Sequence, residues 1–99
     1  MSRQYMFELH LPPTKSEAFV NLIPEQRAYI NDLLADGQLL NYSVTEDLMK
    51  VYCVIEADDE EEAINMVANM PLSAFMKVEI KPLMFYNAVH HQDFQFSKN

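Results

Sequence analysis

Apolar and polar residues alternate along two segments of the chain, one near each end. The first runs from Tyr5 to Leu11 and the second from Met76 to Lys81. Side chains of a strand point in turn to its two faces, so strict alternation predicts a strand with unlike faces. Residues 39–45 and 50–56 are rich in β-branched and aromatic residues and predict two further strands between them.

Apolar residues at helical spacing fill the interval between the first and second predicted strands. Thr14 and Glu17 form a capping-box pattern, which predicts that a helix begins there. Pro24 interrupts this helix, and because proline suits a first helical turn, we expect a second helical stretch from Glu25 to Ala35. Gly37, the only glycine of the chain, supplies the left-handed residue that ends it.

A second helical pattern follows the third predicted strand. Asp58 is the expected cap of this helix, with Glu61 three residues later. The chain then turns at Pro71 and enters the last predicted strand, from Met76 to Lys81. The order is β-α-β-β-α-β, which predicts an α+β, ferredoxin-like subunit with helices on one face of a four-stranded antiparallel sheet. We expect one domain over residues 1–86 and a C-terminal arm over residues 87–99.

The composition excludes several classes of partner and chemistry. The net charge is -8, from 15 acidic and 7 basic residues, which argues against nucleic acid and against an anionic membrane surface. Cys53 is the only cysteine, so no internal disulfide is possible. Strand-like sequence begins within a few residues of Met1 and no apolar run could span a bilayer, so we expect a soluble, cytoplasmic protein.

One face of the predicted sheet has no helix to cover it. Glu8 and His10 line this open face from the first strand, and Lys77 and Glu79 line it from the last. A chain of this length buries only part of its apolar surface, and 49% of its residues are apolar. We therefore expect two copies to pack sheet against sheet as a homodimer, with higher assembly possible, and to enclose a cavity.

Several segments match the pattern of a known family. They are Leu11-Pro12-Pro13, Glu25 with Ala28-Tyr29, Leu33 and Gly37, Tyr52 with its apolar neighbours, and Pro71-Leu72 with Phe75-Met76-Lys77-Val78-Glu79-Ile80-Lys81-Pro82-Leu83. From about Tyr5 to Leu83 the chain resembles the muconolactone isomerase family. The resemblance implies a dimeric α/β barrel and a cofactor-free isomerase of a small organic molecule. In that family the segment after the helix-ending glycine is rich in Trp, Arg and His, whereas residues 38–44 carry no cation here.

Three side chains are candidates for acid–base catalysis. Glu8 and His10 share the open face of one strand, and an imidazole beside a carboxylate can shuttle a proton. The alternative is that this pair forms a solvated or interface hydrogen bond. Glu25 matches a glutamate of the family's helix, which makes it a candidate base; alternatively, it is a first-turn carboxylate that favours the helix dipole.

Candidate ligand-binding residues are less specific. Lys77, Glu79 and Lys81 either bind an anionic ligand or protect an edge strand from aggregation. Tyr29 and Tyr52 offer hydroxyl groups to a pocket, and Asn41 offers an amide from the second strand. Aromatic residues in a dimer interface would equally explain the tyrosines.

The C-terminal residues suggest an arm rather than a metal site. Adjacent histidines in a strand point to opposite faces, so His90-His91 does not form a ligand pair and we expect no metal there. Phe94-Gln95-Phe96 has the pattern of a segment that docks on a neighbouring subunit. Two functional hypotheses result: an isomerase that uses Glu8 and His10, or a non-catalytic oligomeric binding or scaffold protein.

Overall fold

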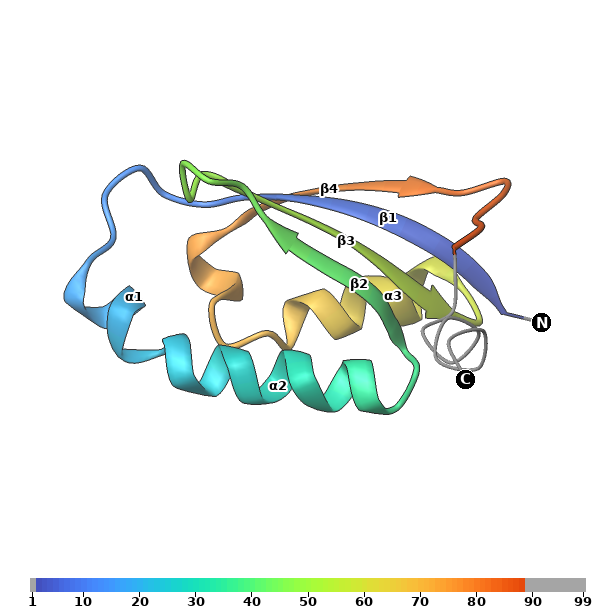
Figure 1. The fold of residues 1–99 in the computed structure, drawn as a ribbon, viewed down its shortest axis with the longest axis horizontal. Helices are drawn as coiled ribbons and strands as arrows, with labels where there is room; N and C mark the ends of the chain where they lie inside the picture. The colour runs from blue at the N-terminus through green and yellow to red at the C-terminus, as the bar shows by residue number, and fades with distance from the viewer. Residues whose placement is uncertain (1, 89–99) are drawn as a thin grey trace, which may run out of the picture.

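Within residues 2–88, a single antiparallel sheet forms one layer and three helices form the other (Figure 1). The computed structural model describes residues 2–88. The elements are β1 (Arg3–His10), α1 (Glu17–Asn21), α2 (Ile23–Ala35), β2 (Leu39–Val44), β3 (Lys50–Ala57), α3 (Glu60–Ala68), a 3₁₀ turn (Ser73–Phe75) and β4 (Lys77–Pro82). The predicted ferredoxin-like α+β fold is confirmed. The predicted C-terminal arm contains His90-His91 and Phe94-Gln95-Phe96, and these residues lie outside the described ones.

Strand β1 lies inside the sheet, whose order is β2-β3-β1-β4. It pairs antiparallel with β3 on one side and with β4 on the other. In this register Glu8 stands opposite both Tyr52 and Glu79, and His10 stands opposite Lys50 and Lys77. Directly paired residues share a face, so these side chains all belong to the side of the sheet that no helix of the described part of the chain covers.

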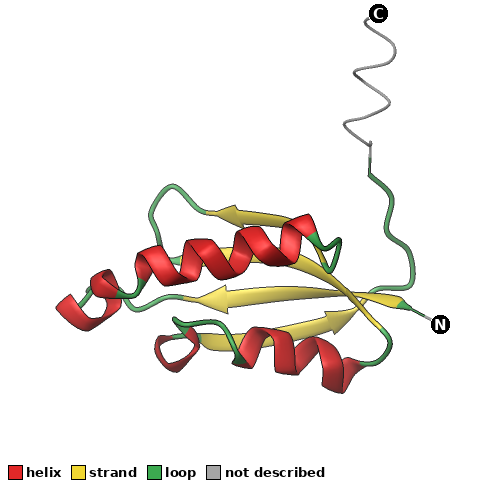
Figure 2. Ribbon diagram, turned by 90° about the horizontal axis from the view of Figure 1, so that it is seen from below, coloured by secondary structure: helices red, strands yellow, loops and turns green. Residues whose placement is uncertain are grey.

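The core lies between the sheet and the helices. Phe7 and Leu9 of β1 and Ile55 of β3 are fully buried, as the alternation predicts. Helices α2 and α3 lie side by side across this face (Figure 2), and Ile30 and Val67 are buried from them. Burying an aliphatic or aromatic side chain of this size contributes about 1.5–3 kcal/mol, which makes this layer the main source of stability.

The starts of all three helices differ from the sequence prediction by one or two residues, and α2 begins at Ile23 instead of Glu25. Ser16, not Thr14, caps α1, and its Oγ accepts a hydrogen bond from the Phe19 amide. Asp59, not Asp58, caps α3, because β3 continues as far as Ala57 and leaves Asp58 to turn the chain. Between α1 and α2 the expected break falls just before Pro24, which takes a place in the first turn of α2.

The end of α2 follows the sequence prediction. Gly37 adopts a φ of 76°, the left-handed conformation expected of the residue that ends the helix. No helix among residues 2–88 is long and apolar enough to cross a membrane.

Candidate functional site

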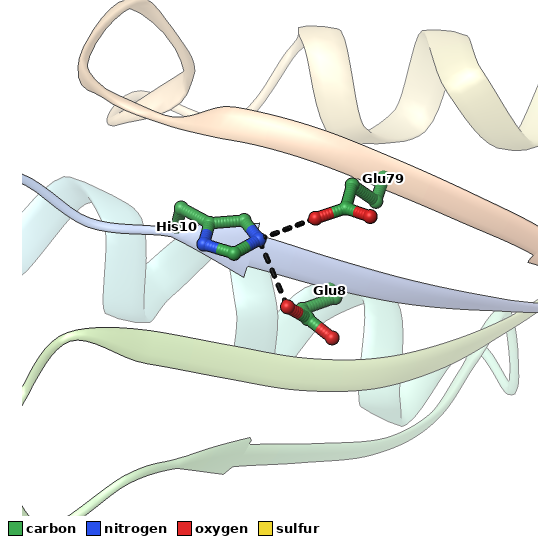
Figure 3. A group of neighbouring side chains, drawn as sticks. All are labelled: Glu8, His10 and Glu79. Atoms are coloured by element: carbon green, nitrogen blue, oxygen red, sulfur yellow. Dashed lines mark hydrogen bonds and ion pairs between the residues drawn. The ribbon is translucent and has the colours of Figure 1, made fainter.

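Three side chains of the open face converge on one point, and we call Glu8, His10 and Glu79 the acid–base cluster (Figure 3). His10 Nε2 lies 2.6 Å from Oε2 of Glu79 and 2.9 Å from Oε2 of Glu8. Glu8 and His10 meet because they are two positions apart on β1. Glu79 of β4 stands directly opposite Glu8 and reaches His10 diagonally. The cluster therefore depends on the register between the two strands.

The cluster holds two carboxylates against a single imidazole nitrogen. One nitrogen carries at most one hydrogen, so the two carboxylates compete for the same hydrogen bond. The hydrogen bond from His10, with the charges of His10, Lys81 and Lys77, holds the pKa of Glu79 below its ordinary value. The cluster therefore holds three groups of the kind that serve in acid–base chemistry at one point of the open face.

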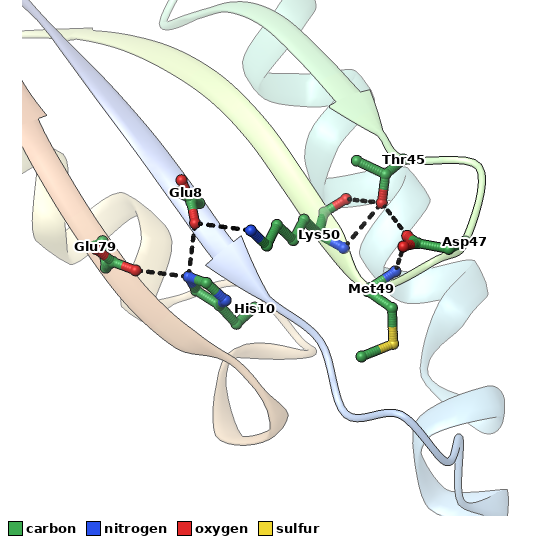
Figure 4. Close-up of polar contacts among 7 residues, drawn as sticks. All are labelled: Glu8, His10, Thr45, Asp47, Met49, Lys50 and Glu79. Carbon is green, nitrogen blue, oxygen red and sulfur yellow. Dashed lines mark hydrogen bonds and ion pairs between the residues drawn. The ribbon is translucent and has the colours of Figure 1, made fainter.

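Lys50 extends the cluster on its other side (Figure 4). Its Nζ lies 3.5 Å from Oε2 of Glu8, and the charge of Glu8 is the largest cause of the raised pKa of Lys50. The sequence analysis missed Lys50. The available signal was its place at the start of the third predicted strand, where it faces His10 in an antiparallel pairing.

A tight turn between β2 and β3 fixes the start of the strand that carries Lys50. Asp47 accepts hydrogen bonds from Thr45 Oγ1 at 2.6 Å and from the Met49 amide at 3.0 Å (Figure 4). These bonds lower the pKa of Asp47 and so keep it a charged acceptor. Between Asp47 and Met49 the chain turns at Leu48, whose φ of 62° is in the left-handed region.

Three of the other predicted residues also lie on the open face. Tyr52 stands opposite Glu8, and Lys77 stands opposite His10. Asn41, on the far edge strand, donates a hydrogen bond of 3.1 Å to the Tyr86 hydroxyl. Asn41 is on β2 and Tyr86 follows β4, and these two strands are the opposite edges of the sheet. The segment after β4 therefore crosses this end of the open face.

Two predicted residues lie on the helix side and are not brought to the acid–base cluster. Tyr29 is on α2 and donates a hydrogen bond of 2.7 Å to the Met66 carbonyl of α3, which ties the two helices together. Glu25 is an exposed residue in the first turn of α2, where a carboxylate favours the helix dipole.

The ligand atoms of Glu8, His10 and Glu79 all lie within 4.8 Å of one another, which is a spacing that a metal ion would accept. Lys50 is paired with Glu8, and Lys77 and Lys81 lower the pKa of Glu79 by their charge. These cations offset the negative charge that would attract a divalent ion. The arrangement therefore suits proton exchange better than metal binding.

A separate cavity of about 560 Å³ lies on the helix side, between α1, α2 and the sheet. Gln26 of α2 and Tyr42 of β2 give it polar groups within an otherwise largely apolar lining. Tyr42 pairs with Cys53 and so faces the opposite side of the sheet from Tyr52 and the cluster. The sequence analysis missed Gln26, although it stands at helical spacing between Ile23 and Ile30.

Comparison with known proteins gives a family and a fold. The family model of muconolactone delta-isomerase matches residues 4–91. No curated protein matches the chain. A 5-chloro-2-hydroxyhydroquinone dehydrochlorinase from Burkholderia phenoliruptrix AC1100, solved with 2,5-dihydroxybenzoquinone, is similar in structure: the TM-score is 0.65 at 14% identity, over 91% of this chain and 97% of that one. An uncharacterized protein from Thermotoga maritima gives a TM-score of 0.46 at 16% identity, over 84% of this chain and 99% of that one.

Proposed function

This chain belongs to the muconolactone delta-isomerase family, and from that premise we propose that it moves a proton within a small organic molecule without a cofactor. The observation that carries this proposal is the convergence of Glu8 and Glu79 on one nitrogen of His10. An imidazole in contact with carboxylates has the groups that general acid–base catalysis uses, which supports proton transfer as the chemistry.

In the proposed reaction, His10 Nδ1 removes a proton from a carbon next to a carbonyl group, while Nε2 keeps the hydrogen that it shares with Glu8 and Glu79. The electrons of the broken C–H bond form a new C=C bond, and negative charge collects on the carbonyl oxygen. Glu8 and Glu79 stabilise the charged imidazole while it holds the proton. His10 then returns the proton to a different carbon, so the double bond moves and nothing is oxidised. Lys50 and Lys77, which flank the cluster in the sheet register, supply positive charge for the oxygen.

A second copy of the chain would complete this site. The side chains of Glu8, His10 and Glu79 are 28%, 31% and 50% exposed, and Met6 and Tyr52 place apolar surface beside them. Covering this face would exclude water and strengthen the electrostatic interactions of the cluster. We therefore propose that two copies pack face to face as a homodimer with the substrate between their sheets.

The dimer is tested by a charge placed on the open face. Met6→Glu should convert a dimer into a monomer in multi-angle light scattering, whereas Ile64→Glu on α3 should not. Met6 is 39% exposed and Ile64 is 41% exposed, so the two variants add the same charge at similarly exposed positions. A wild-type protein that is monomeric at micromolar concentration would exclude the enclosed site.

The chemistry is tested with a panel of lactones and enol-lactones in D₂O, followed by NMR. Wild type should shift the double bond of at least one compound and incorporate deuterium at the new C–H position. His10→Ala should lose this activity by about 10²–10⁴-fold, the usual contribution of a positioned acid–base group. Asp32→Asn, on the exposed side of α2, should keep it. If wild type turns over no compound in the panel, the isomerase proposal fails.

A non-catalytic binding or scaffold function is the second candidate. One observation favours it: residues 38–44 carry no cation. In the family this segment has Arg and His residues, which suit an acidic lactone. Under this hypothesis wild type and His10→Ala bind the same compounds equally and neither converts them.

A further inference from the structure

The helix-side cavity is elongated along α2. Its lining takes residues from Ile23 to Leu34, a span of eleven positions. At a rise of 1.5 Å per residue this corresponds to roughly 16 Å. Leu34, Val44 and Leu48 are among the lining residues and are 41%, 47% and 56% exposed, which marks where the cavity meets solvent. Its volume of about 560 Å³ is within the range of small-molecule sites.

The lining of the cavity is positively charged, whereas the chain as a whole has a negative net charge. The whole chain has 15 acidic and 7 basic residues, yet among the described residues Lys15 and Arg27 are the only charged ones in the lining. Lys15 donates hydrogen bonds to the carbonyls of Pro12 and Leu48, which places its ammonium group at one end. Arg27 is exposed and makes no ion pair within residues 2–88. This local excess of positive charge favours an anion.

A buried polar pair adds a hydrogen-bond donor to the cavity wall. Gln26 is only 4% exposed; its Oε1 accepts from the Leu72 amide at 3.0 Å and its Nε2 donates to the Tyr42 hydroxyl at 3.3 Å. The hydroxyl oxygen of Tyr42 is the acceptor in that contact, so its own hydrogen remains to be donated. Burial is the main cause of the raised pKa of Tyr42, which keeps this hydrogen in place at neutral pH.

We propose that this cavity binds an elongated, apolar molecule with one negative charge, of the class of medium-chain carboxylates. Its carboxylate pairs with Arg27, and its hydrocarbon chain lies along α2 against Ile30 and Leu34. Arginine suits this role because its guanidinium group binds a carboxylate through two parallel hydrogen bonds. A compact ring would leave much of the length unfilled. The cavity and the acid–base cluster lie on opposite faces of the sheet, so this binding does not depend on the proposed isomerase activity.

Isothermal titration calorimetry with octanoate, octanol and acetate tests the class of ligand. We expect saturable one-to-one binding of octanoate, binding of octanol about tenfold weaker, and none of acetate. Arg27→Gln should weaken octanoate about tenfold and leave octanol unchanged, because only the charged ligand loses a partner. Failure of octanoate to bind, or octanol binding as tightly as octanoate, would overturn the proposal.

A pair of tryptophan variants tests the location. Leu34 and Ile64 are each 41% exposed, but Leu34 lines this cavity and Ile64 is on α3, away from it. Leu34→Trp should abolish octanoate binding, whereas Ile64→Trp and His10→Ala should keep it, with circular dichroism showing that all three are folded. If Leu34→Trp binds octanoate as wild type does, the site is elsewhere. If octanoate does not bind and Leu34→Trp changes the subunit number, a second copy covers the cavity instead.

Discussion

His10 and Glu79 are separated by 69 positions in the sequence, yet the His10 Nε2 atom lies 2.6 Å from a carboxylate oxygen of Glu79. Two strands from opposite ends of the chain bring them together, because β1 and β4 pair antiparallel at the edge of the sheet. A slip of one residue between these strands would turn Glu79 to the helix side and destroy the cluster. Residues that are remote in sequence thus form one cluster of titratable side chains.

Removal of the imidazole should raise the pKa of Glu79. The hydrogen bond from His10 is the largest cause of the lowered pKa, so His10→Ala should return that pKa toward its ordinary value of 4.5. Carbon-13 NMR of the side-chain carboxyl group, followed as a function of pH, measures this directly. Lys81→Gln is the matched control and should raise the pKa less, because the charge of Lys81 is a smaller cause.

The lowered pKa of Glu79 predicts how the stability of the fold changes with pH. Glu79 contributes stability above its ordinary pKa, and this contribution is lost as the pH falls through the lowered value. Urea denaturation at pH 7 and in steps below pH 4.5 should therefore show a steeper loss of stability in wild type than in His10→Ala. Parallel curves for the two proteins would contradict the coupling of these residues.

The cap of α3 gives a prediction with a neighbouring control. Asp59 accepts a hydrogen bond of 2.8 Å from the Glu62 amide, so Asp59→Ala should lower the free energy of unfolding by about 1 kcal/mol. Asp58→Ala removes an identical side chain one position earlier and should cost much less. Urea denaturation of both variants measures the difference. Equal losses would mean that charge near the helix start, and not the capping hydrogen bond, stabilises α3.

The alternation of apolar and polar residues predicted β1, β4 and the face that Glu8, His10 and Glu79 share. The β-branched and aromatic content of residues 39–45 and 50–56 predicted the other two strands. The choice between Asp58 and Asp59 could not be predicted, since either side chain can cap and the end of β3 decides. The sequence could not predict that both carboxylates contact one nitrogen, because that contact depends on the register between β1 and β4. Gln26 occupies an apolar stripe, and only its contacts with Tyr42 and Leu72 show why a polar residue stands there.

Gly37 should be needed for its backbone conformation and not for its small size. A Cβ atom added at Gly37 would meet nothing within 4 Å, so Gly37→Ala creates no clash. The cost is that of holding an L-residue at a φ of 76°, about 1–2 kcal/mol. Gly37→Asn should cost less, since Asn tolerates this conformation. Denaturation of both variants checks the order, and an Asn variant as unstable as the Ala variant would point to a different cause.

Cys53 should be chemically silent in the folded protein. Its side chain is 1% exposed on β3, and burial raises the pKa of the thiol from its ordinary value of 9.0 to about 12. The thiolate is the reactive form, so a thiol reagent at pH 8 should label Cys53 only as fast as the chain unfolds.

The matched control for this labelling is Glu46→Cys, which adds an exposed thiol in the turn before β3. This variant should show one rapidly labelled thiol and one slow one in a kinetic assay. Rapid labelling of wild type at pH 8 would instead show that the centre of the sheet opens without global unfolding.

The raised pKa of Cys53 also predicts that stability falls as the pH rises above 9.0 toward 12, because only the unfolded chain ionises its thiol in that range. Cys53→Ala removes the ionising group, so the stability of this variant should fall less steeply over the same interval.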